Sequence, residues 1–303
     1  MYCYQCGKEL PANSAFCAVC GEVQNTNRGN GPNPILRKKK PKVARVVLLS
    51  LFAVAICSLL LFLLVIPSVK YANAIKLANN GEYKEAYEIF KSLDEFRDAA
   101  EQASAIKGDY VADIINSGVT TDIDLGDYYY SWTVLDIQND RALLIGCGDL
   151  LFTSRHYNDT GEYTTWESCF LRQWLNDDLF DYIFNESEKS RILETVVTNA
   201  DNPWYGTDGG NDTRDRIFLL SIDEFVKYLG DSNAFEAAYR EFQSHSGLIR
   251  VEQVPDGTFW LRSPGADNTC AALGATCNDI PFVDGGRVDG RKRVCPVLWF
   301  DLK

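Results

Sequence analysis

The sequence predicts a multi-domain chain in which a small cysteine module, one membrane-spanning helix and a short helical segment precede a larger α+β domain. Three observations support this order: two C-x-x-C pairs lie near the N-terminus, an uncharged apolar run occupies residues 46–66, and short β-type runs dense in aromatic residues begin near Val119. The expected boundaries are 1–23 for the cysteine module, 24–45 for a disordered basic linker, 46–66 for the transmembrane helix, 67–117 for a helical stalk and 119–303 for the α+β domain.

The two cysteine pairs have the spacing of a tetrahedral Zn(II) site. The first pair is C-Y-Q-C-G at 3–7 and the second is C-A-V-C-G at 17–21, with each glycine where the turn favours a positive φ. A module of about 25 residues buries too little surface to fold without a metal. Two disulfides are the alternative, and they would require an oxidising compartment. The predicted zinc ligands are Cys3, Cys6, Cys17 and Cys20.

The apolar run predicts a membrane anchor. A helix over residues 46–66 would be about 31 Å long, enough to cross the hydrocarbon core. A cleaved signal peptide is the alternative, with Ala72-Asn73-Ala74 as its cleavage site, but a secretory apolar region is shorter and lies nearer the N-terminus. A cluster of basic residues directly before the run fits an anchor beside anionic lipid headgroups better than a nucleic-acid patch. Its members are Arg37, Lys38, Lys39, Lys40, Lys42 and Arg45.

Charge asymmetry predicts the orientation of the chain. The chain has 30 basic and 42 acidic residues. Residues 1–45 contain 8 of the basic and 2 of the acidic ones, so the rest of the chain contains 22 basic and 40 acidic residues. Positive segments stay in the cytoplasm, so we expect a cytoplasmic N-terminus and an extracellular C-terminal domain. Nucleic acid is an unlikely ligand for so acidic an ectodomain.

Residues 67–117 predict packed helices. Apolar residues recur at helical spacing over 71–78, 83–90 and 96–106, and Asn79-Asn80-Gly81 separates the first two helices. The stretch GEYKEAYEIFKSL resembles one tetratricopeptide-like hairpin. A single repeat is too short for a stable solenoid, so we expect a stalk, with a partner-binding helix pair as the alternative.

The C-terminal region predicts a mixed α+β domain. Short strands are expected at 123–125, 128–137, 141–146, 259–261 and 294–301, and helices at 166–184, 222–229 and 234–243. Glu167 would lie in the first turn of the helix at 166–184, capped by Thr164 or Thr165. The aromatic and aliphatic residues of this region predict one core. Its expected members are Trp132, Trp166, Leu171, Trp174, Phe218, Leu220, Trp260, Leu261 and Trp299.

Four ordered motifs carry a family resemblance over roughly residues 120–302. They are SWTVLDIQNDRALLI (131–145), TTWESCFLRQWLND (164–177), SEKSRILETVVTNADNPWYGTDGGNDTRDRIFLLSIDE (187–224) and FWLRSP (259–264). The region resembles a domain of unknown function that is widespread in Gram-positive bacteria, and that family is similar to the C-type-lectin-like fold of the formylglycine-generating enzyme. Residues 1–23 resemble the zinc ribbons of bacterial membrane proteins. The resemblances complete the predicted fold class: a four-cysteine zinc ribbon, one transmembrane helix, a tetratricopeptide-like segment and an α+β C-type-lectin-like domain.

The ligand-binding prediction falls on two polar segments, 202–212 and 265–291. Both are rich in Gly, Asp and Asn, and loops held on a rigid scaffold usually carry binding. Trp204 and Tyr205 would stack against a sugar, while Asp208 and Asp212 would accept hydrogen bonds from its hydroxyls. A calcium site is an alternative, although the acidic residues lack the spacing of a known calcium loop. Arg172 and Arg262 are expected to be paired structural residues beside aromatic rings.

These observations predict a non-enzymatic envelope protein. Its zinc ribbon would dock a cytoplasmic protein, and its ectodomain would bind a glycan or an envelope protein. An oxidase of the formylglycine-generating type is one alternative, and it would need Cys270 and Cys277 to bind copper together. A structural scaffold without a small ligand is the other. No metal or other cofactor is expected in the ectodomain, where the only two histidines of the chain, His156 and His245, exclude a histidine-rich cluster.

Overall fold

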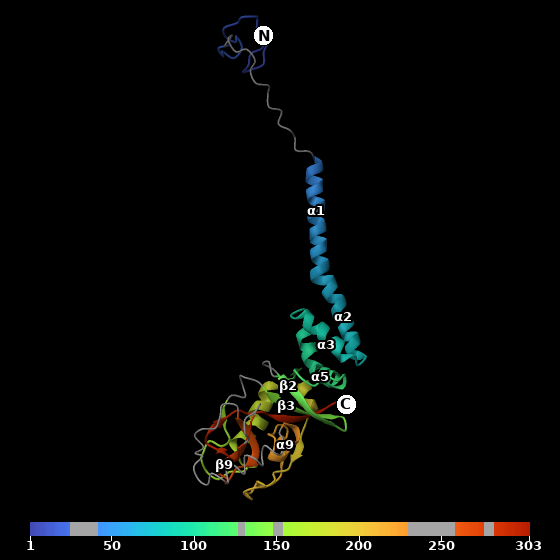
Figure 1. The fold of residues 1–303 in the computed structure, drawn as a ribbon. Helices are drawn as coiled ribbons and strands as arrows, with labels where there is room; N and C mark the ends of the chain where they lie inside the picture. Colours follow the sequence, from blue (N-terminus) through green and yellow to red (C-terminus); the bar gives the residue numbers. More distant parts are fainter. Residues whose placement is uncertain (25–41, 127–130, 148–153, 230–257, 276–281) are drawn as a thin grey trace. The chain divides into compact units, whose positions relative to one another are not determined.

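A computed structural model describes residues 1–24, 42–126, 131–147, 154–229, 258–275 and 282–303 (Figure 1). The described chain forms two compact units, Met1–Leu61 and Phe62–Lys303. Several sequence predictions lie outside the described residues: the helix at 234–243, the first residues of the strand at 128–137, and Cys277.

One long apolar helix extends over Val47–Asn79. This span lies within a longer run of α1 (Lys42–Leu60), a π-helical turn at Leu61–Val65 and α2 (Ile66–Asn79). Pro67 lies in the first turn of α2, and its missing N–H and its ring account for the change in hydrogen-bond register just before it. Every Val, Leu, Ile and Phe from Val47 to Ile66 is at least 40% exposed, and the most apolar window of the helix contains no buried residue.

Three further helices follow α2. They are α3 (Tyr83–Leu93), α4 (Ala99–Ala105) and α5 (Lys107–Asn116). Helix α3 packs on α2, and α4 and α5 pack on α3. Gly81, with a φ of 81°, allows the tight turn between α2 and α3. Alanines let the helices approach closely around two aromatic rings, as the sequence predicts. The buried members of this cluster are Ala74, Ala86, Tyr87, Phe90, Ala99 and Ala103.

The main sheet of the C-terminal region has five antiparallel strands in the order β1-β2-β3-β12-β5. Its strands are β1 (Ile123–Asp124), β2 (Ser131–Gln138), β3 (Arg141–Cys147), β12 (Val297–Asp301) and β5 (Ile192–Leu193). Asn139 and Asp140 both have positive φ, the conformation that joins two strands by a two-residue hairpin turn. Strand β12, the last described strand, lies in this sheet between β3 and β5.

Smaller sheets and short helices complete the region. A three-stranded sheet has the order β10-β9-β8, and two strand pairs are β11-β4 and β6-β7. These strands are β8 (Thr258–Pro264), β9 (Cys270–Ala275), β10 (Phe282–Arg287), β4 (Arg155–His156), β11 (Arg291–Lys292), β6 (Thr195–Val197) and β7 (Thr213–Asp215). The helices are α6 (Phe170–Trp174), the π-turn η2 (Leu175–Leu179), α7 (Phe180–Ile183), α8 (Glu186–Arg191) and α9 (Ile222–Tyr228).

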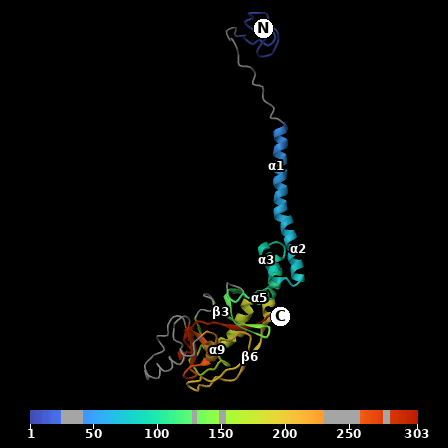
Figure 2. The ribbon, with the colours of Figure 1, turned by 45° about the vertical axis from the view of Figure 1, so that its right-hand side comes forward.

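All nine residues predicted for the core are buried, with exposed fractions between 0 and 9%. They belong to one continuous cluster, which confirms the core prediction. The same cluster includes Val111, Ala112, Ile114 and Ile115 of α5. Helix α5 thus packs into the core of the C-terminal region, although the sequence analysis assigned it to the stalk. Figure 2 shows α5 between α3 and the sheet.

The helix predicted at 166–184 begins later than expected. Its first helical residue is Phe170, and the Cys169 thiol rather than Thr164 or Thr165 caps it by accepting from the Arg172 amide. Trp166 and Glu167 lie in the turn before the helix. The buried indole of Trp166 fixes this turn, because it is hydrogen-bonded to Asp215 on β7. Tertiary contacts therefore override the local helix signal.

Candidate functional site

The N-terminal module is built from two equivalent turns, one around each cysteine pair. In the first turn the Cys3 amide donates to Lys8 O at 2.8 Å, and the Gly7 amide donates to Cys3 O at 2.9 Å. In the second, the Cys17 amide donates to Glu22 O and the Gly21 amide to Cys17 O, both at 2.8 Å. The glycines have φ of 72° and 76°, which agrees with the predicted turn geometry. Each turn therefore directs two thiols toward the same point.

The four sulfurs have the separations of a tetrahedral metal site. Cys3 Sγ lies 3.6 Å from Cys20 Sγ, and Cys6 Sγ lies 3.6 Å from Cys17 Sγ. All four sulfurs lie within 4.8 Å of one another. Zn–S bonds of about 2.3 Å in a tetrahedron place the sulfurs about 3.8 Å apart, which is close to the two separations of 3.6 Å. The predicted cluster of four cysteines is confirmed as a group that can hold a metal ion.

The surroundings of Cys3 favour its thiolate. Burial opposes ionisation of this thiol, but the amides of Cys6 and Gln5 donate toward the sulfur, and its pKa is lowered to about 6. The Gln24 side chain adds a donor, with Nε2 3.2 Å from Cys3 Sγ. The position of Gln24 relative to the second cysteine pair is equivalent to that of buried Leu10 relative to the first. The sequence analysis, which ended the module at residue 23, missed this contact.

In the C-terminal region, the two polar segments of the ligand prediction contact each other. Asn202 is 1% exposed, and its Nδ2 donates to Pro264 O at 2.9 Å and to Val283 O at 3.1 Å. Thr207 Oγ1 donates to Ala266 O at 2.9 Å, and Asn268 Nδ2 donates to Asp208 O at 2.7 Å. These bonds cross from one segment to residues in or beside the other, so the described parts of the two segments pack against each other.

The predicted ligand-binding side chains differ in their surroundings. Trp204 and Tyr205 are half-buried and pack against the main core, with their amides bonded to Asn202 Oδ1. Asp208 and Asp212 are exposed, but each closes the loop by accepting a backbone amide, from Gly210 at 2.9 Å and from Asn199 at 3.2 Å respectively. The aromatic rings thus anchor the loop, and the two carboxylates hold its shape while facing solvent.

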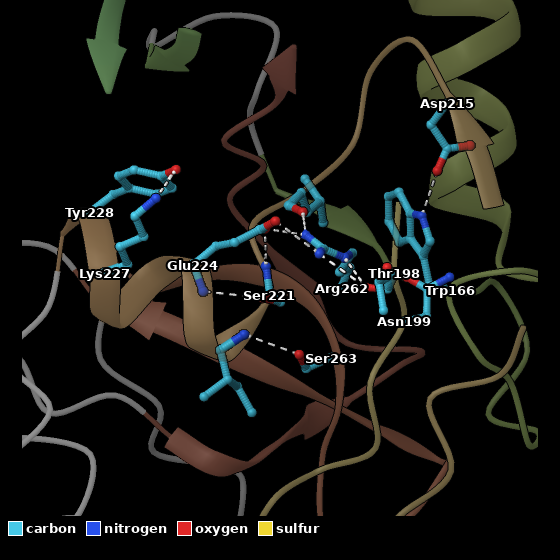
Figure 3. Close-up of polar contacts among 12 residues, drawn as sticks. Trp166, Thr198, Asn199, Asp215, Ser221, Glu224, Lys227, Tyr228, Arg262 and Ser263 are labelled. Atoms are coloured by element: carbon cyan, nitrogen blue, oxygen red, sulfur yellow. Dashed lines mark hydrogen bonds and ion pairs between the residues drawn. The ribbon is translucent and has the colours of Figure 1, made fainter. Parts of the chain in front are cut away.

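Arg262 has a structural role (Figure 3). Its guanidinium pairs with Glu224 through both terminal nitrogens, and it also donates to Thr198 O and to Leu219 O at 2.7 Å. These five bonds use all five N–H donors of the side chain, which is 4% exposed. Glu224 is also part of the capping box of α9, with its Oε2 2.9 Å from the Ser221 amide. Arg262 therefore ties α9 to β8, as the paired-residue prediction expects.

A second buried network surrounds Asp215, which is 1% exposed, and Figure 3 shows its bond to Trp166. Its Oδ2 accepts from Trp166 Nε1 at 2.9 Å and from Thr213 Oγ1 at 2.7 Å. Its Oδ1 accepts from Arg172 Nε at 2.7 Å. The pairing prediction for Arg172 is thereby confirmed, and the network joins α6, the preceding turn and β7.

Burial raises the pKa of two thiols of the C-terminal region, Cys169 and Cys270. Burial raises the pKa of Cys169 to about 12. Burial also raises the pKa of the half-buried Cys270, and the nearby Asp267 charge adds to the effect. The proposed copper pair of Cys270 with Cys277 is untested, because Cys277 lies outside the described residues. Within the described ranges, the only group of three or more His, Cys, Asp or Glu side chains close enough to hold a metal is the N-terminal cluster of four cysteines.

The C-terminal region matches a protein family. Residues 137–302 match the family described as a domain of unknown function, DUF6273. The match covers more than half of the 303 residues, so the chain belongs to this family. Searches of curated proteins and of solved structures found no match. The likeness to the C-type-lectin-like fold stays a prediction.

Proposed function

We propose that this chain is a single-pass membrane protein that carries a cytoplasmic zinc ribbon and presents a DUF6273 domain outside the cell as a non-enzymatic ligand-binding domain. The observation that carries the proposal is the apolar helix Val47–Asn79, whose most apolar window contains no buried residue. So much exposed apolar surface in water would be strongly unfavourable, and lipid is the surrounding that removes this cost. The basic cluster before the helix supports the cytoplasmic placement of the N-terminus.

Membrane attachment is tested by fractionating cells that produce the full chain. The chain should stay in the membrane pellet after washing at alkaline pH, which releases peripheral proteins. A variant with Leu51→Lys, Val54→Lys and Leu59→Lys should lose this attachment, because each lysine at the centre of a span costs about 2.5–3.5 kcal/mol. A wild-type chain that appears in the soluble fraction would refute the anchor.

Orientation is tested with a membrane-impermeant thiol reagent on intact cells. An Asn25→Cys variant should be labelled only after permeabilisation, and an Asn80→Cys variant should be labelled from outside, each measured above the signal of the unmodified chain. Asn25 and Asn80 lie on opposite sides of the uncharged run. Labelling of Asn25→Cys in intact cells would overturn the orientation while leaving the anchor in place.

Zinc is the ion that best suits the site of four cysteines. Four thiolates in tetrahedral arrangement are typical of structural Zn(II), which is bound without redox chemistry and stabilises modules too small to fold alone. Purified full-length chain in detergent should release one zinc per chain when its thiols are blocked, measured with a colorimetric zinc chelator. Cys17→Ser should release far less, while Cys57→Ser, which alters an exposed cysteine in α1, should release as much as wild type.

The proposal of ligand binding is supported by the contact of Asn202 and Thr207 with residues 264–268, which holds the two polar segments together. A glycan array with the full-length chain in detergent tests the predicted ligand class. For a glycan that binds, Asp208→Asn and Asp212→Asn should weaken binding without lowering the melting temperature by more than a few degrees, because asparagine retains the oxygen that accepts the backbone amide. Unchanged affinity in both variants would exclude these carboxylates from the binding surface.

A further inference from the structure

The two halves of the N-terminal module share a backbone arrangement but differ in one buried side chain. Leu10 and Gln24 each follow the first cysteine of their pair by seven residues. The Leu10 amide donates to Met1 O at 2.6 Å, and the Gln24 amide donates to Ala15 O at 2.8 Å. Leu10 is 7% exposed and Gln24 is 6% exposed. One half of the module therefore buries a hydrocarbon side chain where the other half buries an amide.

The side-chain amide of Gln24 has a defined orientation. Its Nε2 donates to Cys3 Sγ at 3.2 Å and to Glu22 O at 3.0 Å, so both of its N–H groups are used. Its Oε1 accepts from the Tyr4 amide at 3.3 Å. Exchanging the nitrogen and the oxygen would bring two donors together at Tyr4 and two acceptors together at Glu22. The N–H group must therefore point at the sulfur.

The sulfur that receives this bond is a predicted metal ligand with little access to water. Cys3 is 2% exposed. Four thiolates carry two more negative charges than a divalent ion neutralises, and N–H donors to the sulfurs stabilise this excess charge. Gln24 supplies such a donor from a side chain. Leu10, in contrast, forms an apolar cluster with Cys3 and Cys17 and has no donor to offer.

The bonds of Gln24 also join the two halves of the module. Cys3 and Tyr4 belong to the first cysteine turn, whereas Glu22 and Gln24 lie at the end of the second. The Tyr4 hydroxyl makes another link between the halves by donating to Glu22 Oε1 at 2.7 Å, but this bond is exposed to water. Gln24 thus links the first turn to the second from a buried position, beside the sulfur that must meet the ion.

We propose that Gln24 is a positioning residue of the metal site, which stabilises the Cys3 thiolate through an N–H···S bond and holds the first cysteine turn against the second. This role rests on the zinc site of the proposed function. It adds a side-chain donor to the four cysteine ligands and makes residue 24 part of the metal-binding module.

The test compares two replacements of similar size in the full-length chain in detergent. Gln24→Met keeps the length of the side chain and removes every bond of the amide. Gln24→Glu keeps the oxygen that accepts from the Tyr4 amide, but it replaces the donor to Cys3 Sγ with a second oxygen. If Gln24 served only to hold Tyr4, the glutamate variant would bind zinc as the wild type does. If the donor to sulfur matters, both variants bind zinc more weakly.

Zinc affinity is measured by competition with a chromophoric chelator at neutral pH. Both Gln24 variants should bind zinc about 10- to 100-fold more weakly than the wild type, which is the usual effect of removing a partner of a metal ligand. Glu9→Met and Val23→Glu are the matched controls, because they introduce the same two residue types at the exposed positions just before Leu10 and Gln24. Each control should change the affinity less than about fivefold.

A spectroscopic readout separates the bond to sulfur from a general loss of stability. With Co(II) in place of zinc, the thiolate-to-metal charge-transfer absorption depends on the energy of the sulfur lone pairs. An N–H···S bond lowers that energy, so metal-saturated Gln24→Met should absorb at longer wavelength than the wild type. The d–d bands should keep the pattern of tetrahedral coordination. Glu9→Met should leave both absorptions unchanged.

Three results would overturn the role of Gln24: wild-type zinc affinity in Gln24→Met, wild-type affinity in Gln24→Glu, or an unshifted charge-transfer absorption in Gln24→Met. Cys17→Ser separates this failure from failure of the zinc site. A wild-type chain that binds zinc no better than Cys17→Ser would refute the site and, with it, the role of Gln24. Tight binding by the wild type together with unaffected Gln24 variants would refute the role of Gln24 alone.

Discussion

Replacing Asp215 by asparagine should destabilise the C-terminal region strongly. The carboxylate accepts from Trp166 and Thr213 on one oxygen and from Arg172 on the other, and it is 1% exposed. Asparagine offers an oxygen on one side only. Its NH2 group must therefore face either the indole N–H of Trp166 or the guanidinium of Arg172, and a buried donor then loses its acceptor.

The size of the effect follows from this geometry. Removing one partner of a buried ion pair costs about 3–5 kcal/mol. The Arg172 side chain is 23% exposed and can turn partly toward water, which places the expected loss near the lower end, at about 3 kcal/mol. For a region of this size, 1 kcal/mol corresponds to about 2–4 °C, so the melting temperature should fall by about 6–12 °C.

Thermal unfolding followed by near-ultraviolet circular dichroism measures this change directly, since Trp166 is part of the network. Asp177→Asn serves as the matched control, because Asp177 is exposed in the neighbouring π-turn. A shift below about 2 °C in Asp215→Asn would refute the view that this pair holds the turn before α6 against β7.

Three further perturbations have defined outcomes. Trp174→Ala should cost about 3–5 kcal/mol in unfolding free energy by denaturant titration, because a 9% exposed indole is lost; an unchanged midpoint would contradict the core assignment. Arg262→Lys should lower the melting temperature by several degrees although the charge is kept, since an ammonium cannot replace five guanidinium donors; a wild-type melting curve would refute this. Three groups hold their protons more tightly in the folded state, Lys107, Tyr87 and Tyr110. Burial raises the pKa of each tyrosine to about 12. Burial opposes the charge of Lys107, but the carboxylates of Glu188 and Asp124 outweigh it and raise the pKa of this lysine. Stability should therefore fall as the pH rises from about 10 to 12, and Tyr110→Phe should reduce the slope of that fall in equilibrium unfolding.

The sequence alone determined the features that depend on local chemistry. Two C-x-x-C-G turns determine the geometry of four thiols with few backbone torsions, so the cluster of four cysteines could be predicted from their spacing. A long uncharged apolar run favours a single helix, and the structure has an apolar helix over Val47–Asn79 that is long enough to cross a membrane. The buried tryptophans were also predictable, because large aromatic residues repeated within ordered motifs have few other places to lie.

Only the tertiary structure decided the features that depend on contacts between distant residues. Trp166 lies outside the helix predicted for it because Asp215, far along the chain, accepts a hydrogen bond from its indole N–H. Helix α5 joined the main core because its apolar face meets the sheet and α8, not only the helices before it. Gln24 belongs to the cysteine module because its side chain bonds to the Cys3 sulfur, 21 residues earlier in the chain. The periodicity of apolar residues predicts which face of a segment is buried. It does not predict which other segment covers that face, because this depends on packing across the whole chain.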